Sequence, residues 1–403
     1  MLSGKRVVLG ITGSIASYKA ADLASRLTQA GALVDAILTP AATQFITPLA
    51  IRGLTRRAVY IDIFDENSEL AEAHVELARA AAAILIAPAS ADSIARIAHG
   101  RADDMLGLTV LATAAPVVIA PAMDSQMWTN PATQENVGIL KIRGVVFAGP
   151  AEGHLASGRS GAGRLETTEV VLGALSAVLG RAGDLAGYRL VVTAGGTKEP
   201  IDPVRYVGNH SSGKMGYAIA EAARDRGAEV TLVSAPTALS DPYAVRMVMA
   251  STAAEMCDAV LRECRAADAL IMAAAVADYR PRSSAAQKIK KEGATGLTLD
   301  LEPTVDVLEA VQRAEPDLIR VGFAAESEDL VAHAAQKLKR KGLSLIAAND
   351  ITASDAGFGS DTNRVVLLDA GGGSESLPLM SKHEVAHHLL DRLRPLLENR
   401  PRS

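Results

Sequence analysis

Two places in this 403-residue chain show the same succession of an aliphatic strand pattern, a glycine turn and a helical pattern. The first strand pattern runs from Arg6 to Ile11 and leads into Gly13-Ser14, and the second runs from Arg189 to Ala194 and leads into Gly195-Gly196. Continuous apolar strands that alternate with helices are typical of parallel sheets covered on both faces. The chain is also too long for one ordinary core. The sequence therefore predicts an α/β protein with two doubly wound, Rossmann-like domains.

Further aliphatic runs continue both patterns, and the chain divides near its middle. A helical pattern from Val170 to Leu179 gives way to a short glycine-containing run from Gly180 to Asp184. Such a run is typical of a domain boundary, so we expect domains over 1–180 and 185–403. The other expected strands are 33–38, 83–87, 117–120, 229–233, 269–273, 319–323 and 343–347.

The last part of the chain has a different pattern. Two short apolar runs, 364–369 and 376–379, flank the three glycines at 371–373. Glycines between two strand patterns indicate a hairpin. We expect this hairpin to be followed by a final helix over 381–397.

Composition limits the classes of partner. The formal charge of −5 argues against broad nucleic-acid binding, so an anionic ligand requires local basic clusters. Only two cysteines are present, Cys257 and Cys264, and this favours a reducing cytoplasm over a disulfide framework. The N-terminus lacks the long apolar core of a signal peptide, and apolar runs such as 80–89 are too short to span a bilayer. We expect a soluble cytoplasmic protein.

The glycine turn after the first strand is a candidate phosphate site. Gly13 would let the backbone approach a phosphate, the Ser14 hydroxyl could donate to it, and Thr39 follows the second strand at the same sheet edge. The dinucleotide fingerprint G-x-G-x-x-G is absent. A turn with a helix cap explains these residues equally well, so the turn alone does not identify a ligand.

Three further segments of the N-terminal half are each expected to end a strand: Ala87 to Ser93, Pro121 to Trp128, and Gly153 to Arg164. Taken singly, each could be a turn with a helix cap. Together with the opening G-I-T-G-S-I-A-S-Y-K, they closely resemble the phosphopantothenoylcysteine decarboxylase family over Arg6 to Leu165.

This resemblance implies a flavodoxin-like domain that binds FMN. In this family the flavin first oxidises the substrate thiol to a thioaldehyde, which provides the electron sink that CO2 loss requires. His74 matches the family's acid–base histidine, although a histidine at the start of a helical pattern could equally be a surface residue. The positions that match the flavin site are Gly13, Ser14, Thr39, Ser90 and Met123.

The sequence departs from the family pattern at three positions. Asp124 stands where the family usually has the asparagine that binds the substrate carboxylate, and Ser157 stands where it has the cysteine that protonates the enethiolate. Asp92 also replaces a common asparagine. A carboxylate facing a carboxylate is repulsive, and a hydroxyl is a weaker acid than a thiol. Two readings stay open: decarboxylation with another proton donor, such as water or His74 acting through Ser157, and a stalled or scaffold-only flavin domain.

In the C-terminal half, glycines, hydroxyls and basic residues gather after the opening strand. The segments are Thr193 to Arg205 and Asn209 to Gly216, and a lysine run follows at Lys288 to Lys291. A capped turn and a solvated loop would explain them, but a run of this composition at a sheet end also suits an anion.

These segments, with A-A-A-V-A-D-Y at 273–279, resemble the phosphopantothenate–cysteine ligase family from Leu185 to Leu390. The order of the two halves matches the bacterial bifunctional fusion. The resemblance implies that the substrate carboxylate attacks the α-phosphate of CTP, pyrophosphate departs, and the amine of cysteine then displaces CMP. Lysines and Mg2+ (or Mn2+) would stabilise the charge on the triphosphate. The metal would be held mainly by the CTP phosphates, and its protein ligands are unknown.

The resemblance also assigns roles in this half. Lys288 would stabilise the first transition state, Asn209 would serve the second step, and Arg205 and Lys214 are candidates for the phosphate of 4'-phosphopantothenate. Lys337 and Lys341 are spaced to share one helix face. Val305 replaces a common proline. The expected CTP site consists of Ala273, Ala274, Ala275, Asp278, Lys288, Thr304, Val305, Asp306, Val307, Phe323, Lys337 and Lys341.

Three alternatives are kept. The ligase half alone could be active, with the N-terminal domain a flavin-binding scaffold. The chain could be a nicotinamide oxidoreductase, although the missing fingerprint and the lysine loop count against this. It could also be a non-catalytic assembly module. By resemblance we expect a homo-oligomer in which flavin domains form trimers and ligase domains form dimers, giving a dodecamer.

Overall fold

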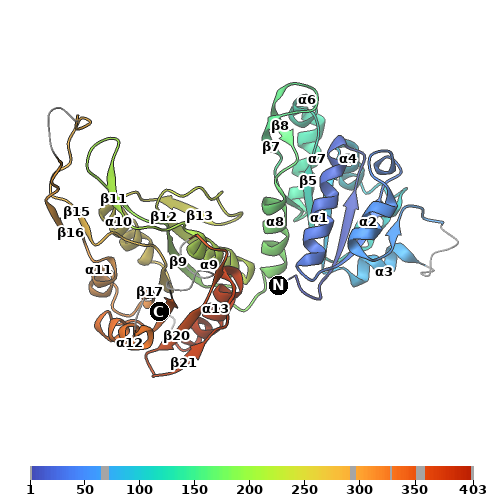
Figure 1. Ribbon diagram of the computed structural model, residues 1–403. Coiled ribbons are helices and arrows are strands. Elements are labelled where there is room, and N and C mark those ends of the chain that lie inside the picture. The colour runs from blue at the N-terminus through green and yellow to red at the C-terminus, as the bar shows by residue number, and fades with distance from the viewer. Residues whose placement is uncertain (1, 65–71, 291–295, 327–328, 351–358, 401–403) are drawn as a thin grey trace. The chain divides into compact units, whose positions relative to one another are not determined.

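The computed structural model describes residues 2–64, 72–290, 296–326, 329–350 and 359–400. The chain forms two compact units, Met1–Arg181 and Ala182–Ser403. Each unit has its own sheet with helices on both faces (Figure 1). No helix in the described ranges combines the length and apolar character needed to cross a membrane.

The sheet of the first unit is parallel throughout and has the strand order β3-β2-β1-β4-β5-β6. This order reverses between β1 and β4, and it differs from the order 2-1-3-4-5 of flavodoxin itself. The predicted doubly wound sheet is confirmed. Its strands are β1 (Arg6–Ile11), β2 (Leu33–Leu38), β3 (Val59–Tyr60), β4 (Ala83–Ala89), β5 (Val117–Pro121) and β6 (Val146–Phe147).

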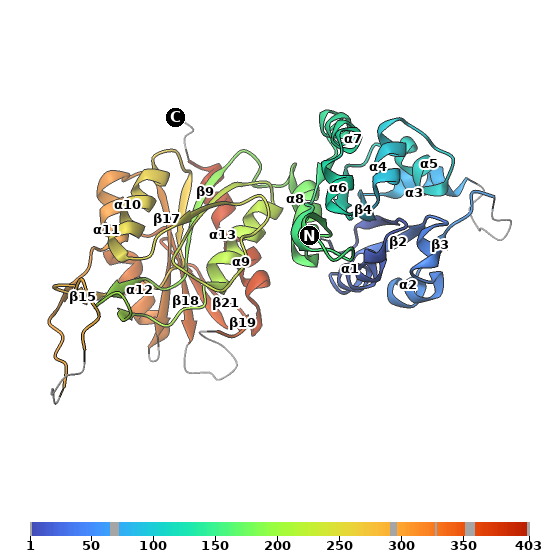
Figure 2. The same cartoon turned by 90° about the horizontal axis from the view of Figure 1, so that it is seen from above.

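Two helical layers cover this sheet, as Figure 2 shows from above. Aliphatic side chains fill the core, including Val8, Ile84 and Ile119, which are fully buried. One layer contains α1 (Tyr18–Gln29), α2 (Pro48–Thr55) and α8 (Thr168–Gly180). The other contains α3 (Ala73–Ala80), α4 (Ala91–Ala98), α5 (Met105–Ala112) and α7 (Pro131–Ile142).

The segment Gly153 to Arg164 does not end a strand of the main sheet, so that expectation is wrong. It forms a separate antiparallel hairpin of β7 (Ala151–His154) and β8 (Ser160–Arg164). Its glycines supply no apolar side chains for a sheet core, and they let the hairpin lie close to another segment. A Cβ on Gly163 would overlap the carbonyl oxygen of Met123. The hairpin therefore packs by its backbone against the start of α6 (Ser125–Thr129).

The sheet of the second unit is mixed, with the order β13-β12-β9-β14-β17-β18-β20-β21. The first six strands are parallel, whereas β20 and β21 run antiparallel and form the predicted hairpin. The strands are β9 (Arg189–Ala194), β12 (Glu229–Ser234), β13 (Arg246–Met249), β14 (Ala269–Met272), β17 (Ile319–Glu326), β18 (Leu345–Asp350), β20 (Val365–Asp369) and β21 (Ser374–Ser376).

Helices again cover both faces of this sheet. One face packs against α9 (Lys214–Asp225) and α13 (Lys382–Glu398). The other packs against α10 (Ala253–Cys264), α11 (Val307–Ala314) and α12 (Leu330–Arg340). Ser381 begins α13 with a capping box, because its side chain accepts from the Glu384 amide while Glu384 reaches back to the Ser381 amide.

A half-buried histidine in α13, His387, predicts a loss of stability in weak acid. Burial lowers the pKa of His387 to about 4, and the nearby positive charges of His383 and Arg226 act in the same direction. Its Nε2 is buried with no hydrogen-bond partner among the described residues. The unfolded state, with a pKa near 6.5, binds the proton more readily, so stability falls as the pH drops from about 6.5 to about 4.

We expect His387→Gln to reduce this dependence on pH. The measurement is amide hydrogen exchange in α13 at pH 7 and pH 5, normalised to the intrinsic exchange rate at each pH. An unchanged dependence in the variant would assign the effect to other groups.

Candidate active sites

A cavity of about 770 Å³ lies in the second unit, beyond the carboxyl ends of β9, β14 and β17. It brings together most of the residues that the sequence predicted for the ligase. The predicted residues that line it are Asn209, Lys214, Ala273, Ala274, Ala275, Asp278, Thr304, Val305, Asp306, Val307, Phe323, Lys337 and Lys341.

Backbone contacts between β9 and β14 fix one wall of this cavity. The strand order reverses between these two strands, which is where ligands bind in open α/β sheets. The Ala275 amide donates to the Gly195 carbonyl at 2.8 Å, and the Thr197 amide donates to the Ala275 carbonyl at 3.2 Å. Thr193 Oγ1 accepts from the Ala274 amide at 3.0 Å. The loop after β14 is therefore held beside the glycine turn after β9.

The N-terminus of α9 forms another wall. Gly213 is the N-cap at φ +79° and provides no side-chain cap. A Cβ on Gly216 would lie 2.5 Å from the carbonyl oxygen of Thr193, so only glycine lets α9 approach β9 this closely. The first amides of the helix lie at the cavity, where they suit an anion.

The two predicted lysines of the α12 region both line the cavity. Lys337 Nζ donates to the Phe323 carbonyl at 2.8 Å. Lys341 follows the last helical residue and forms an ion pair with Asp306. Burial opposes ionisation of Asp306, but the hydrogen bond and charge of Lys341 outweigh it and lower the pKa of this carboxyl. Positive charge therefore lies on the α12 side of the cavity.

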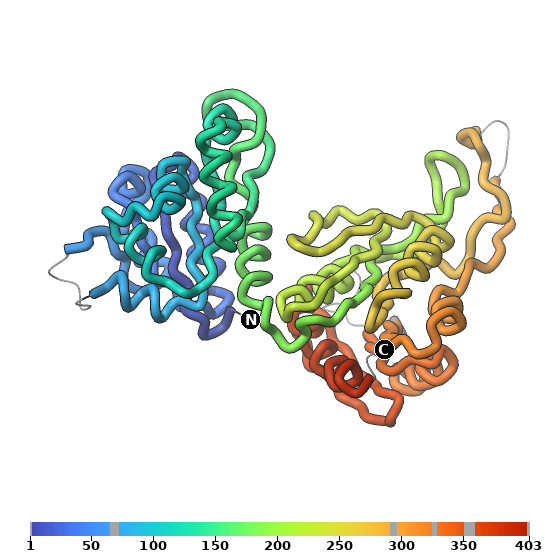
Figure 3. The backbone as a smooth tube through the Cα atoms, turned by 180° about the vertical axis from the view of Figure 1, so that it is seen from behind, coloured from blue at the N-terminus to red at the C-terminus, as the bar shows by residue number. Residues whose placement is uncertain are grey.

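Lys288 and Arg205 lie elsewhere, in two hairpins that extend from the sheet. Lys288 is exposed between β15 (Tyr279–Pro281) and β16 (Leu301–Pro303), and it does not line the cavity. Figure 3 shows this segment in orange beside the turn between β10 (Lys198–Pro200) and β11 (Tyr206–Gly208). Lys291 lies outside the described residues.

The segment that carries Lys288 is tied to that turn. Arg205 Nη2 donates to the Ile289 carbonyl at 2.7 Å, and the Ile289 amide donates to Asp202 Oδ2 at 3.2 Å. The Asp202 side chain is fully buried, and its other oxygen accepts from the amides of Val204 and Arg205. The structure thus places Arg205 in contact with Ile289, the residue that follows Lys288.

Sequence reasoning missed several polar residues that line the cavity: Arg340, Asn349, Asn363 and Lys382. A ladder between β19 (Thr362–Asn363) and β22 (Met380–Ser381) places the last two together. Lys382 is only 7% exposed, and the Oδ1 atoms of Asn349 and Asn363 are buried without a hydrogen-bond partner among the described residues. No local pattern marks Asn363 or Lys382, because a two-residue ladder brings their segments to the cavity.

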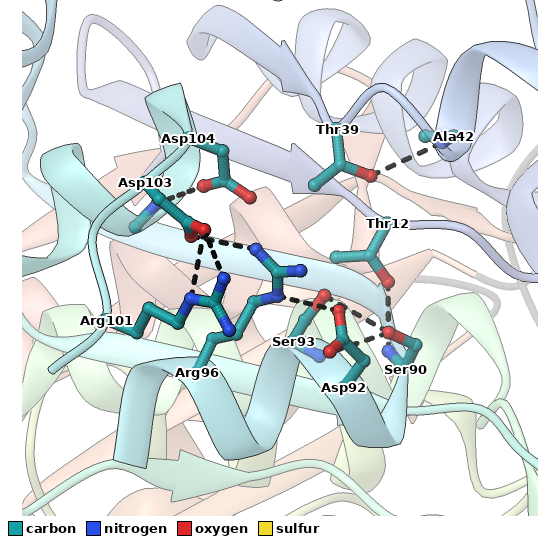
Figure 4. Close-up of polar contacts among 11 residues, drawn as sticks. Thr12, Thr39, Ala42, Ser90, Asp92, Ser93, Arg96, Arg101, Asp103 and Asp104 are labelled. Atoms are coloured by element: carbon teal, nitrogen blue, oxygen red, sulfur yellow. Dashed lines mark hydrogen bonds and ion pairs between the residues drawn. The ribbon is translucent and has the colours of Figure 1, made fainter. Parts of the chain in front are cut away.

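In the first unit, the predicted flavin residues surround the ends of β1, β2 and β4. Thr12 is fully buried and joins two of these ends, because its Oγ1 donates to the Pro88 carbonyl and accepts from the Ser90 amide, both at 2.9 Å. Figure 4 shows Thr12, Thr39 and Ser90 around this edge. Ser14 Oγ accepts from the Ala16 amide at 3.2 Å and Thr39 Oγ1 from the Ala42 amide at 3.3 Å.

The turn after β1 is packed closely. A Cβ on Gly13 would lie 2.5 Å from Ala41 Cβ, so glycine is required where this turn meets the turn after β2. Asp92 forms an ion pair with Arg96 at 2.8 Å, as Figure 4 shows. The close turns and hydroxyls at this edge fit a phosphate-bearing group such as FMN.

The remaining predicted residues lie on other elements. His74 is the second residue of α3 and is half-buried. Asp124 caps α6, accepting from the Gln126 amide at 3.0 Å, and it also accepts from Ser157 of the β7–β8 hairpin at 2.6 Å. The Met123 amide donates to the Gly163 carbonyl at 2.9 Å. The two positions that depart most from the family pattern are therefore in contact.

Known proteins match both units. A family model described as flavoprotein matches residues 1–180, and one described as the DNA/pantothenate metabolism flavoprotein C-terminal domain matches 185–396. The coenzyme A biosynthesis bifunctional protein CoaBC of Bacillus subtilis is 44% identical over 98% of both chains, and that of Escherichia coli is 42% identical over 97% of both. A crystal structure of the C-terminal domain of CoaBC covers 54% of this chain and 99% of its own, with 40% identity and a TM-score of 0.47. The chain belongs to the family of bifunctional coenzyme A biosynthesis enzymes, which join a phosphopantothenoylcysteine decarboxylase to a phosphopantothenate–cysteine ligase.

Proposed function

We propose that the second unit binds CTP in the 770 Å³ cavity and uses it to join 4'-phosphopantothenate to cysteine. The observation that carries this proposal is the convergence of backbone amides, lysines and apolar residues on one cavity at the crossover of the sheet. The loop over 304–307 and Phe323 offer a slot for the base. Lys337, Lys341 and the α9 N-terminus offer positive charge for phosphates.

The chemistry requires a carboxylate oxygen to become a leaving group. The substrate carboxylate attacks the α-phosphate, pyrophosphate leaves, and the amine of cysteine then displaces CMP from the acyl-cytidylate. Lys288 stabilises the charge of the first step, and this role requires its segment to move onto the cavity, because Lys288 lies outside the cavity lining in this structure. Asn209 serves the second step. Asn209 Nδ2 donates to the Val276 carbonyl at 3.0 Å, at the cavity wall.

The cations have distinct assignments in this proposal. Lys214, which lines the cavity and is paired with Asp361 at 2.7 Å, meets the phosphate of 4'-phosphopantothenate. Arg205 joins it only if it leaves its contact with the Ile289 carbonyl outside the cavity. Mg2+ or Mn2+ enters with the CTP phosphates. Among the residues that the structure describes, no group of three or more His, Cys, Asp or Glu side chains is placed to hold a metal ion.

In the first unit, Gly13, Ser14, Thr39, Ser90 and Met123 bind FMN, which supplies the two-electron chemistry needed for decarboxylation of 4'-phosphopantothenoylcysteine when it is bound. The close turns hold its phosphate, and His74 moves the proton of the substrate thiol. The alternative is an active ligase whose N-terminal domain is a flavin-binding scaffold. The hydrogen bond of Ser157 to Asp124 supports this alternative, because it occupies the hydroxyl proton.

The test is product analysis of the full-length protein with 4'-phosphopantothenate, cysteine, CTP and Mg2+. The proposal expects 4'-phosphopantetheine, CO2, CMP and pyrophosphate, and a flavin absorbance spectrum in the purified protein. Accumulation of the cysteine adduct without CO2 would favour the scaffold alternative. Absence of pyrophosphate release would contradict the ligase assignment.

We also propose a cytoplasmic homo-oligomer, in which flavin domains form trimers and ligase domains form dimers, up to a dodecamer. Sedimentation of the full-length protein measures its mass. A monomer at micromolar concentration would contradict this assembly.

A further inference from the structure

A short hydrogen bond joins two of the residues assigned to the decarboxylase half. Ser157 Oγ donates to Asp124 Oδ2 at 2.6 Å, across 33 positions of sequence. Asp124 Oδ1 accepts from the Gln126 amide at 3.0 Å, so both oxygens of the carboxylate are engaged. The carboxylate caps α6, while Ser157 lies in the turn between β7 and β8. The contact therefore joins two elements.

Other contacts also hold the β7–β8 hairpin against the start of α6. The Met123 amide donates to the Gly163 carbonyl at 2.9 Å, and a Cβ on Gly161 would lie 3.0 Å from Ser125 Cβ. These contacts involve β8. At the tip, the Gly158 amide donates to the Leu155 carbonyl at 2.9 Å, and Leu155 is buried. The Ser157 hydroxyl ties this tip to the N-cap of α6 by a hydrogen bond, and the charge of Arg159 also acts on Asp124.

The direction of the hydrogen bond follows from the charge of Asp124. The hydrogen bond from Ser157 and then that from the Gln126 amide lower the pKa of this carboxyl, and the charge of Arg159 acts in the same direction. Asp124 is therefore ionised at neutral pH and can only accept. The single proton of Ser157 points at the carboxylate, which leaves the hydroxyl as an acceptor toward any other group.

We propose that Asp124 and Ser157 act as one hydrogen-bonded unit, in which Asp124 is a positioning residue that holds Ser157 and the tip of the β7–β8 hairpin against α6. This inference rests on the proposed decarboxylase function of the first unit. In this inference Ser157 holds the hairpin tip against α6. It does not donate the proton that the product receives. The Asp124 carboxylate thereby has a role other than binding the substrate carboxylate.

Trypsin cleavage after Arg159 measures opening of the tip in the full-length protein, because Arg159 is exposed and lies next to the turn. We expect Asp124→Ala and Ser157→Ala each to raise the initial rate of this cleavage by about five-fold. The double variant should be cleaved no faster than Asp124→Ala, because that single variant already loses this bond together with the α6 cap and the charge beside Arg159. Asp124→Asn retains only one of the two acceptor oxygens, so its cleavage rate should lie between those of the parent and of Asp124→Ala.

Thr129→Ala is the matched control, because its hydroxyl also lies on α6 but donates within the helix to the Ser125 carbonyl. It should leave the cleavage rate unchanged. Cleavage of Ser157→Ala at the parental rate, or multiplied effects in the double variant, would overturn the proposal.

Release of CO2 from 4'-phosphopantothenoylcysteine gives a second readout. A positioning pair predicts that Asp124→Ala and Ser157→Ala both lower kcat, and that the double variant loses no more than Asp124→Ala, which also lacks the α6 cap. If Ser157 were the proton donor, Ser157→Ala alone would stop turnover while Asp124→Ala kept it, and this result would overturn the proposal. Absence of CO2 from the parent protein would contradict the proposed decarboxylase, whereas the trypsin experiment would still decide whether the pair exists.

Discussion

Replacing Lys288 by glutamine is expected to reduce CTP-dependent pyrophosphate release by about a hundred-fold to a thousand-fold. The variant loses a cation from the step in which charge develops on the triphosphate, and removal of one such stabilising group typically costs this much. The measurement is pyrophosphate release with saturating 4'-phosphopantothenate and CTP. Lys290→Gln is the matched control, because Lys290 is also exposed in the same segment and has no assigned role.

Asn209→Asp separates the two steps of the ligase. Here the acyl-cytidylate should form and accumulate, because only its reaction with cysteine is impaired. Mass spectrometry of quenched reactions detects this intermediate. An identical block in Lys288→Gln and Asn209→Asp would show that the two residues do not divide the steps in this way.

Loss of Lys337 should have the largest effect on nucleotide affinity. Lys337→Met removes a partly buried charge at the cavity wall, and we expect the Kd for CTP to rise about thirty-fold. Lys339→Met is the control, because Lys339 lies on the same helix but is exposed and does not line the cavity. Calorimetric titration measures both constants. If both variants raised the Kd for CTP equally, the lysines would act through the overall positive charge of the helix, and Lys337 would make no direct contact with the nucleotide.

Central strands could be predicted closely from the sequence, and edge elements could not. The bounds of β1, β2 and β9 agree with the aliphatic runs, because a strand buried on both faces reads as a continuous apolar segment. The edge strand β21 occupies 374–376, whereas its pattern suggested 376–379. A three-residue strand paired on one side carries little periodic signal.

The candidate cavity was predictable where its residues follow strands. Loops such as 273–275 come after a recognisable strand, and parallel strands end at one edge, so these loops meet there. Asn363 and Lys382 were missed because a short ladder, rather than a sheet strand, brings them to the cavity. Lys288 lies in an extended segment positioned by Asp202 and Arg205, and no periodicity reveals such a contact.

The separation of the hydrophobic cores has a consequence for how the protein melts. The core of the first unit around β4 draws on residues from Val8 to Leu140, and the two clusters of the second unit lie within Leu185 to Leu397. Each of these cores is therefore built from side chains of its own unit, so each unit can melt as a cooperative block of its own. Heating the intact protein should give two overlapping calorimetric transitions, and a single Tm would describe neither half.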